Sequence, residues 1–295
     1  MTTYAPRIDV EAISALDVHV HIEADGHGHL ALDQELLDAS AKYFRGDQER
    51  TPTLDQVAEH YRSRTMAAVV FTVDAGTFLG HPALSSEEIA EGCAANADVL
   101  IPFGSVDPNR GERAVAQARR LVEEYGVRGF KFHPSLQAFD PSDRAHYPLY
   151  DALEELGVIA LFHTGQTGIG AGLPGGRGIK LRYSDPMLVD DVAADFPTLR
   201  IILAHPSVPW VDSSISMATH KANVFVDLSG WSPKYFPPQL VRQARTLLRD
   251  KVLFGSDFPV IIPDRWLADF DQLELDETVR RQILRDNAVR LLGLG

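Results

Sequence analysis

Histidine and aspartate side chains stand where four apolar segments of this chain end. They are His19 and His21 in the first segment, His163 and His205 in two later ones, and Asp257 near the C-terminus. Side chains alternate along a strand with a period of two, so His19 and His21 would point to the same face. Two imidazoles at that spacing can bind one metal ion, and imidazole nitrogens with a carboxylate oxygen suit Zn²⁺ and, less selectively, Mn²⁺ or Fe²⁺. The sequence therefore predicts a divalent metal site, with Zn²⁺ as the preferred ion.

Each of these residues also has a purely structural interpretation. An H-x-H pair occurs often by chance, and a lone histidine at a strand end is more often a hydrogen-bonded core residue than a ligand. Asp257 follows Gly255 and Ser256 and would also suit the cap of the next helix. The combination favours the metal site, because four different strands would all place His or Asp at the same end.

Eight apolar segments, separated by helical patterns, would position these side chains. We expect strands at 13–20, 67–73, 99–106, 127–133, 158–163, 199–205, 223–228 and 251–255. This alternation is typical of parallel βαβ units, and its length fits an α/β fold of the (β/α)8 TIM-barrel type, which has about 250 residues. A doubly wound sheet is the alternative. In the barrel, catalytic side chains would lie at the carboxyl ends of the strands.

No linker or repeat divides the chain, so we expect one domain over residues 1–295. An excursion at 22–52, which reads as irregular, follows the first strand, and a Gly-rich stretch at 165–178 follows the fifth. The stretch formally contains a G-x-G-x-x-G motif from Gly170 to Gly175, but Pro174 lies inside it and no helix begins at its end. Both segments leave the carboxyl ends of strands, so we interpret them as loops that cover the site.

Composition and charge exclude several classes of function. The chain has 41 Asp and Glu against 28 Lys and Arg, a net charge of -13, which argues against nucleic-acid or anionic-membrane partners. The single cysteine, Cys93, cannot form an internal disulfide, which favours a cytoplasmic location and excludes thiolate-rich metal sites. No apolar run approaches the roughly 18 residues of a transmembrane helix. We expect a cytoplasmic protein that acts on a small molecule.

Five motifs resemble, in the same order, those of the amidohydrolase superfamily. They are DVHVH at 17–21, HTG at 163–165, the segment 184–210, LFGSDFPV at 253–260 and ILRDNAVRLLGL at 283–294. The pattern is similar to the amidohydrolase-related group that includes aminocarboxymuconate-semialdehyde decarboxylase. The resemblance implies that His19, His21, His163 and Asp257 hold the metal. It also implies that His205 is a histidine outside the ligand set, which polarises the substrate or a bound water.

Other residues near the predicted strand ends are candidates for substrate contacts. Lys131 and His133 stand on the fourth strand, where the decarboxylases of the group carry uncharged residues. Binuclear members carry a carboxylated lysine on this strand, so Lys131 would either bridge two ions or, in the mononuclear site that we prefer, pair with an acid or a substrate carboxylate. Arg182, with Arg177 and Lys180, would anchor an anionic substrate or be a solvated loop charge. Trp231 and Trp210 would stack an aromatic substrate or belong to the core.

The chemistry that we predict is hydrolysis by a metal-activated water, in a metal-dependent hydrolase. Asp257 would take the proton from that water, and His205 would stabilise the oxyanion or protonate the leaving group. The segments 129–139 and 163–186 resemble a subset that hydrolyses a C–C bond of hydroxyphenyl β-ketoacyl-CoA thioesters. The alternative is a nonoxidative decarboxylase, a lyase, of an aromatic or unsaturated carboxylic acid. A non-catalytic, metal-bearing subunit is the second alternative. We expect the protein to form a homodimer whichever of these functions it has.

Overall fold

Eight parallel strands form the centre of the protein, whose computed structural model describes residues 3–44 and 51–295. The strands are β1 (Ala15–His21), β2 (Met66–Phe71), β3 (Leu100–Pro102), β4 (Gly129–Phe132), β5 (Ile159–His163), β6 (Arg200–Ala204), β7 (Val224–Asp227) and β8 (Val252–Leu253). They pair in the orders β1-β2-β3 and β4 to β8. Parallel bridges from Gly104 to Phe130 and from Val20 to Phe258 join the two sets at both edges. The strands therefore close into a ring, and the predicted (β/α)8 barrel is confirmed.

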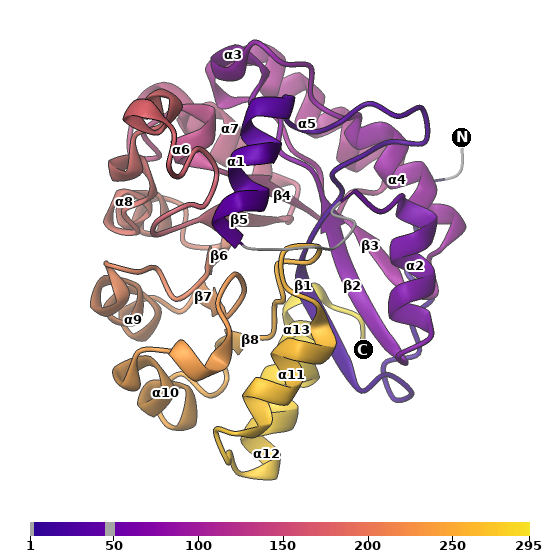
Figure 1. The fold of residues 1–295 in the computed structure, drawn as a ribbon, viewed down its shortest axis with the longest axis vertical. Helices are drawn as coiled ribbons and strands as arrows, with labels where there is room; N and C mark the ends of the chain where they lie inside the picture. Colours follow the sequence, from indigo (N-terminus) through magenta and orange to yellow (C-terminus); the bar gives the residue numbers. More distant parts are fainter. Residues whose placement is uncertain (1–2, 45–50) are drawn as a thin grey trace.

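Helices surround this ring of strands (Figure 1). The long ones are α2 (Leu54–Arg62), α4 (Ser86–Ala95), α5 (Glu112–Tyr125), α7 (Tyr147–Glu155), α8 (Met187–Asp195), α9 (Val211–His220), α10 (Pro238–Arg245) and α11 (Pro263–Asp271). The short helices are α3 (Gly76–Leu79), α6 (Pro134–Gln137), α12 (Glu277–Arg281) and α13 (Asn287–Leu292), and the π-helical residues Gln282–Asp286 join the last two. Helix α1 (Gln34–Phe44) is drawn in front of the strands in Figure 1.

The helices and strands form where the spacing of apolar residues in the sequence predicts them. In α5 the buried residues Ala114, Ala118, Leu121 and Tyr125 recur every three or four positions, and all the charged residues of the helix lie outside this buried stripe. Gly126 ends this helix with a left-handed φ of 75°, which costs little without a Cβ. Strand β5 is buried along its whole length, as is typical of a parallel sheet covered by helices.

The excursion after β1 is not irregular throughout, contrary to our prediction. Helix α1 occupies its second half, because Leu36 and Ala39 form a buried stripe and the Asp33 carboxylate accepts a hydrogen bond from the Leu36 N–H at 3.0 Å. The glycines that suggested a loop, Gly26 and Gly28, precede the helix. Residues 45–50 of the predicted excursion lie outside the described residues.

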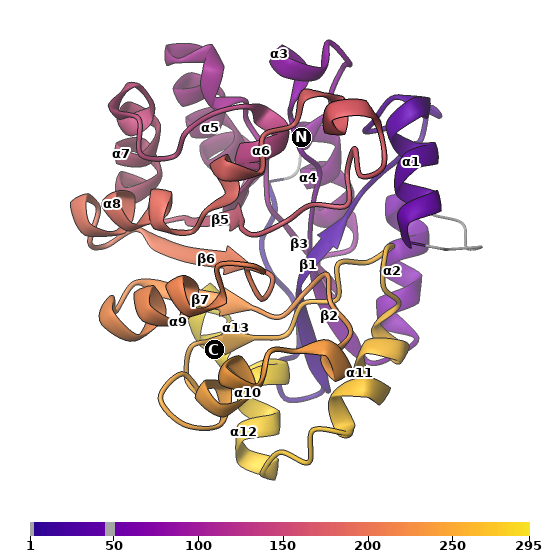
Figure 2. The same ribbon diagram turned by 60° about the vertical axis from the view of Figure 1, so that its left-hand side comes forward.

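A second, smaller apolar cluster joins α1 to the Gly-rich segment. It contains Leu32, Leu36, Ala75 and Leu136, with apolar side chains of the Gly-rich segment packed against it. Arg177 also binds two carboxylates of the excursion, Asp33 at 2.9 Å and Glu35 at 2.6 Å. Figure 2 shows this segment approaching α1. We call residues 22–44 and 165–179 together the roof, because they leave the carboxyl ends of β1 and β5.

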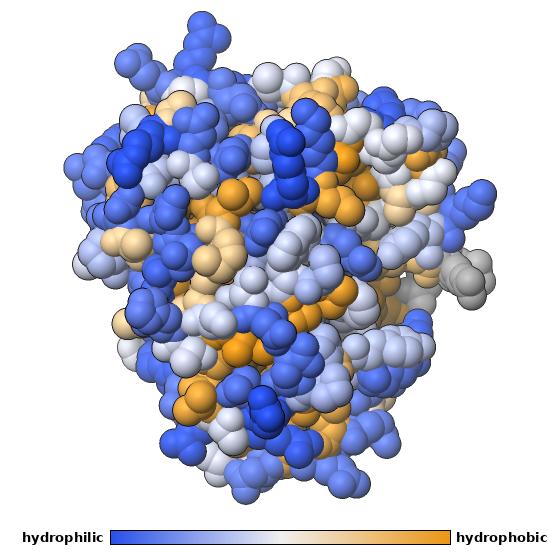
Figure 3. All heavy atoms as spheres, turned by 90° about the vertical axis from the view of Figure 1, so that its left-hand side faces the viewer, coloured by the Kyte–Doolittle hydropathy of each residue, from blue (hydrophilic) through white to orange (hydrophobic). Residues whose placement is uncertain are grey.

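The outer surface is mainly hydrophilic on the face that Figure 3 shows. Hydrophilic side chains surround scattered apolar ones there. Within residues 3–44 and 51–295, no helix combines the length and the apolar character that crossing a membrane requires.

Candidate active site

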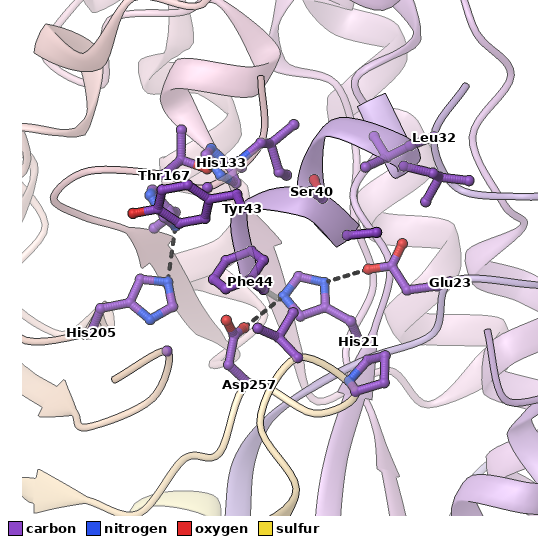
Figure 4. Close-up of a pocket in the computed structure, with 18 of the residues that line it drawn as sticks. His21, Glu23, Leu32, Ser40, Tyr43, Phe44, His133, Thr167, His205 and Asp257 are labelled. Carbon is purple, nitrogen blue, oxygen red and sulfur yellow. Dashed lines mark hydrogen bonds and ion pairs between the residues drawn. The ribbon is translucent and has the colours of Figure 1, made fainter. Parts of the chain in front are cut away.

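Three predicted ligands converge at the carboxyl ends of β1 and β8. His19 Nε2 lies 3.3 Å from His21 Nε2, and Asp257 Oδ1 lies 3.3 Å from each of these nitrogens. Figure 4 shows His21 between Glu23 and Asp257. A point about 2 Å from all three atoms exists for a triangle of this size, and Zn²⁺ binds nitrogen and oxygen ligands at about 2.0–2.2 Å. The three side chains therefore fit one metal ion.

Local backbone geometry places these three ligands. The pairing of β1 with β2 shifts register between Asp17 and Val20, which is the bulge that surrounds His19. Beyond β8 the chain takes a left-handed turn at Asp257, where φ is 70°. The Asp257 N–H donates to the His19 carbonyl at 3.0 Å, so the two ligands are also joined through the main chain.

His205 and His163 lie beside this triangle. Ligand atoms of His19, His205 and Asp257 all lie within 4.8 Å of one another. His205 Nε2 lies 2.9 Å from His163 Nδ1, while His163 Nε2 is buried and has no hydrogen-bond partner among the described residues. A buried imidazole nitrogen without a partner is costly unless it binds an ion, so His163 fits the role of a fourth ligand.

Burial favours the neutral form of His19, His163 and His205. It lowers the pKa of His19 to about 3, with a further contribution from the Lys131 charge, and it lowers the pKa of His163 and His205 as well. Burial alone would raise the pKa of Asp257, but its hydrogen bond with His21 and its interactions with His19 and His205 lower that pKa below its usual range. Neutral imidazole and ionised carboxylate are the forms that bind metals.

Lys131 and His133 occupy different positions, although they share a strand face. The Lys131 ammonium is fully buried, 2.9 Å from His19 Nε2 and 5.0 Å from the centre of the Phe71 ring. Burial lowers its pKa to about 8. His133 stacks on His163 with ring centres 3.7 Å apart, and its Nδ1 accepts the Leu136 N–H at 3.2 Å. Lys131 thus touches the metal-binding cluster itself, whereas His133 reaches the cavity described next.

A cavity of about 730 Å³ opens above the cluster and beneath the roof. His21, His133, His163, His205 and Asp257 form its polar floor. The aromatic side chains that line it are Tyr43, Phe44, Trp231 and Tyr235. Figure 4 shows the Tyr43 and Phe44 rings over this floor. The cavity therefore joins a floor of potential metal ligands to an aromatic upper wall, and Trp231, a predicted substrate contact, lines it.

The structure does not bring the predicted loop cations to this cavity. Arg182 is exposed and stacks on Tyr183, with its guanidinium carbon 5.0 Å from the ring centre. Arg177 is held by the roof carboxylates, and neither it nor Lys180 is among the described residues lining the cavity. Trp210, the other predicted aromatic contact, is also not among them.

Sequence reasoning did not single out the cavity-lining Tyr43, Phe44 and Tyr235, and it also missed three partners of the site's histidines. Asp227, at the end of β7, accepts a hydrogen bond from His19 Nδ1 at 2.9 Å, and Ser229 Oγ lies 2.8 Å from His205 Nδ1. The Glu23 carboxylate lies 3.5 Å from His21 Nδ1. Asp227 carries a signal that could have found it, because it is a carboxylate at a predicted strand end, as Asp257 is. Ser229 and Glu23 carry no comparable signal.

Comparison with known proteins agrees with this geometry. The model of the amidohydrolase family matches residues 16–294. The chain belongs to the amidohydrolase family. It is 22% identical over 243 residues to 2-amino-3-carboxymuconate-6-semialdehyde decarboxylase of Dictyostelium discoideum, a match that covers 71% of this chain but only 65% of that relative. The predicted resemblance is therefore confirmed.

Solved structures show the same barrel. An uncharacterised TIM-barrel protein from Bordetella bronchiseptica has a TM-score of 0.78 and 23% identity, over 95% of this chain and 98% of that one. A dihydroxybenzoic acid decarboxylase from Polaromonas sp. JS666, solved with manganese and the inhibitor 2-nitroresorcinol, has a TM-score of 0.67 and 16% identity, over 96% and 97% of the two chains. At these identities the likeness establishes the fold.

Proposed function

We propose that this protein is a metal-dependent decarboxylase that releases CO₂ from an aromatic or unsaturated carboxylic acid without an oxidant. The observation that carries the proposal is the triangle of His19, His21 and Asp257 at the floor of an aromatic-lined cavity. The decarboxylases named above, one of them with bound manganese, support this reaction over the hydrolysis that the sequence favours.

The metal would be held by His19, His21, His163 and Asp257. When bound, a divalent ion supplies a Lewis acid that polarises the oxygens of the substrate. The donor set of nitrogens and one carboxylate admits both Zn²⁺ and Mn²⁺, so the identity of the ion is a matter for measurement.

The remaining residues of the site orient the substrate and move one proton. Tyr43, Phe44 and Trp231 offer ring faces to an aromatic acid, and a stacked pair contributes about 0.5–1.5 kcal/mol beyond the area it buries. The reaction breaks the bond between the ring carbon and the carboxylate, releases CO₂ and places a proton on that carbon. His205 is our candidate for passing that proton from solvent water to the carbon, because it lines the cavity and the proposed ligand set does not need it.

The experiment is a substrate screen of the purified chain loaded with Zn²⁺ or Mn²⁺. Hydroxybenzoates and unsaturated dicarboxylates are tested for CO₂ release, and aryl β-ketoacyl-CoA thioesters are tested for cleavage, in water enriched in ¹⁸O. Decarboxylation leaves the organic product free of ¹⁸O, whereas hydrolysis places the label in a new carboxylate. CO₂ release that requires the metal supports the proposal, and turnover only of thioesters with label uptake refutes it.

Hydrolysis of a larger carbonyl substrate is the second candidate. The cavity of about 730 Å³ lies within the range of pockets that hold drug-sized ligands, and a single-ring acid would fill a small part of it. In this reaction water adds to a ketone, the neighbouring C–C bond breaks, and an aromatic carboxylic acid and a shortened thioester result. The same screen separates the two reactions.

A further inference from the structure

A buried hydrogen-bond network lies at the carboxyl end of β7, on the side of His19 and His205 away from the proposed ligand triangle. Asp227 and Ser229, both fully buried, form its centre. The Asp227 carboxylate accepts His19 Nδ1–H at one oxygen, at 2.9 Å. Its other oxygen accepts the N–H groups of Ser229 at 2.9 Å and His205 at 3.2 Å, and the Ser229 hydroxyl. Each N–H or O–H group around the Asp227 carboxylate therefore donates to one particular carboxylate oxygen.

Counting protons in this network fixes the tautomers of two histidines. Ser229 has one hydroxyl proton and donates it to Asp227. The Nδ1 atoms of His19 and His205 lie 3.0 and 2.8 Å from the same hydroxyl oxygen, so each must supply a proton of its own. The Ser229 carbonyl, which can only accept, also lies 3.0 Å from His205 Nδ1. Both neutral imidazoles therefore carry Nδ1–H and keep a lone pair on Nε2.

The tautomer of His205 also determines the tautomer of a third histidine, His163. Because His205 Nε2 is an acceptor, the His163 Nδ1 atom 2.9 Å away must be the donor. His163 then keeps its lone pair on Nε2, which is the buried atom without a described partner. One carboxylate on β7 thus determines the direction of three imidazoles that come from β1, β5 and the end of β6.

We propose that Asp227 and Ser229 are positioning residues that hold His19, His205 and His163 as Nδ1–H tautomers, so that Nε2 of His19 and Nε2 of His163 can bind the metal while Nε2 of His205 accepts the His163 Nδ1–H. The inference rests on the proposed metal site but not on the identity of the substrate. Partners of this kind orient metal-binding histidines, and their loss weakens metal binding by about 10- to 100-fold.

Two substitutions of Asp227 distinguish control of the tautomer from simple packing. In Asp227→Asn the amide oxygen must face the N–H groups of Ser229 and His205, so the amide NH₂ faces His19 Nδ1. That donor drives the His19 proton to Nε2 and blocks metal binding. In Asp227→Ala no fixed donor faces Nδ1, because the Ser229 hydroxyl 3.0 Å away can either accept from it or donate to it, and the Nδ1–H tautomer stays accessible. A packing role predicts the opposite order, because asparagine preserves the shape of the side chain.

The test measures the affinity of the full-length chain for Zn²⁺ by competition with a chromophoric chelator. We expect an affinity loss of about tenfold for Asp227→Ala and about 100-fold for Asp227→Asn. The control is Asp107→Asn: Asp107 is also fully buried and accepts main-chain N–H groups, from Thr77 and Asn109 at 3.0 Å, but no imidazole. Its Zn²⁺ affinity should stay within about twofold of the wild type, since no ligand is touched.

A second measurement does not depend on how the variants fold. Long-range ¹H–¹⁵N spectra of the wild-type chain labelled with ¹⁵N-histidine report the tautomer of each ring, and the His205 signal is identified by its loss in His205→Gln. Nδ1–H on His205 supports the proposal. Nε2–H on His205, or an Asp227→Asn variant that binds Zn²⁺ at least as tightly as Asp227→Ala, overturns it. Failure of every decarboxylase assay would leave both measurements unchanged, so the two proposals fail separately.

Discussion

The roof of the cavity depends on an arginine in an unfavourable backbone conformation. Arg177 has φ 57° and ψ 25°, in the left-handed region, where a residue with a Cβ pays about 1 kcal/mol or more. It binds Asp33 and Glu35, and partly exposed ion pairs of this kind contribute about 0.2–1 kcal/mol each. Arg177→Ala removes both ion pairs but keeps the strain, whereas Arg177→Gly removes both the ion pairs and the strain.

The two variants should therefore differ in how often the roof opens. Arg177→Ala should lower the free energy of roof opening by about 1 kcal/mol, which raises the open population about fivefold. Arg177→Gly should recover about 1 kcal/mol of that loss and open nearly as rarely as the wild type. Hydrogen exchange followed by mass spectrometry on peptides covering 30–44 and 168–179 measures this opening, with a peptide of β6 as the internal reference.

Either of two results would refute this account of the roof. Exchange in Arg177→Ala that matches the wild type would show that the ion pairs contribute nothing to closure. Faster exchange in Arg177→Gly than in Arg177→Ala would show that backbone strain at this position is unimportant. A change in the β6 peptide would mean that the whole barrel, and not the roof, had been destabilised.

Three further predictions concern the site and the barrel. Asp257→Asn should weaken Zn²⁺ binding by about tenfold or more and lower turnover with it, measured by chelator competition and steady-state kinetics; unchanged binding would remove Asp257 from the ligand set. Trp231→Ala should raise KM for an aromatic substrate by about 2- to 12-fold with a smaller change in kcat, from the loss of about 0.5–1.5 kcal/mol of stacking; an effect on kcat alone would contradict a stacking role. Burial lowers the pKa of His146 below 6.5, so the folded state binds this proton less readily than the unfolded chain does. The contribution of His146 to the free energy of unfolding is therefore complete above pH 6.5 and is lost as the pH falls below that value. His146→Gln should flatten that fall by at most about 1.4 kcal/mol per pH unit, measured by urea unfolding at pH 7.5, 6.5 and 5.5; an identical slope would show that His146 titrates alike in both states.

The barrel was predictable because its strands are buried on both faces. Such strands read as continuous apolar runs, and all eight lie within the expected segments or within two residues of them. The last segment shows where the prediction stops. We expected a strand at 251–255, but β8 contains only Val252 and Leu253, because the chain then bends towards β1 and the Phe254 carbonyl accepts the Val18 N–H at 3.0 Å. That bend, which no local sequence pattern predicts, places Asp257 beside His19.

The proposed ligands could be singled out in the sequence, whereas their partners could not. His19, His21, His163 and Asp257 each stand at or just beyond the end of an apolar run, and the barrel gathers such ends at one face. Asp227 and Ser229 act on His19 from about 210 positions further along the chain, a contact that exists only once β7 and β1 lie on either side of β8 in the closed barrel. The reaction itself could not be predicted, since decarboxylation and hydrolysis use the same donors and differ in the substrate atom that receives a proton or a hydroxide.

The hydrogen bonds around His19 and His205 also explain why the ligand atoms at the carboxyl ends of the strands suit a cation. Asp227 satisfies the Nδ1–H of His19, and the Ser229 carbonyl satisfies that of His205, so the protons of these rings point away from the cavity. The Nε2 lone pair of His19 is left facing His21 Nε2 and an Asp257 oxygen, each 3.3 Å away. The His19 lone pair and the Asp257 oxygen are both acceptors, and they repel each other at that distance unless a positive charge lies between them. The Lys131 ammonium, 2.9 Å from His19 Nε2, supplies such a charge, and a divalent ion bound by all three groups would compete with it for the same lone pair. Metal binding and the position of Lys131 are therefore coupled, whichever reaction the site performs.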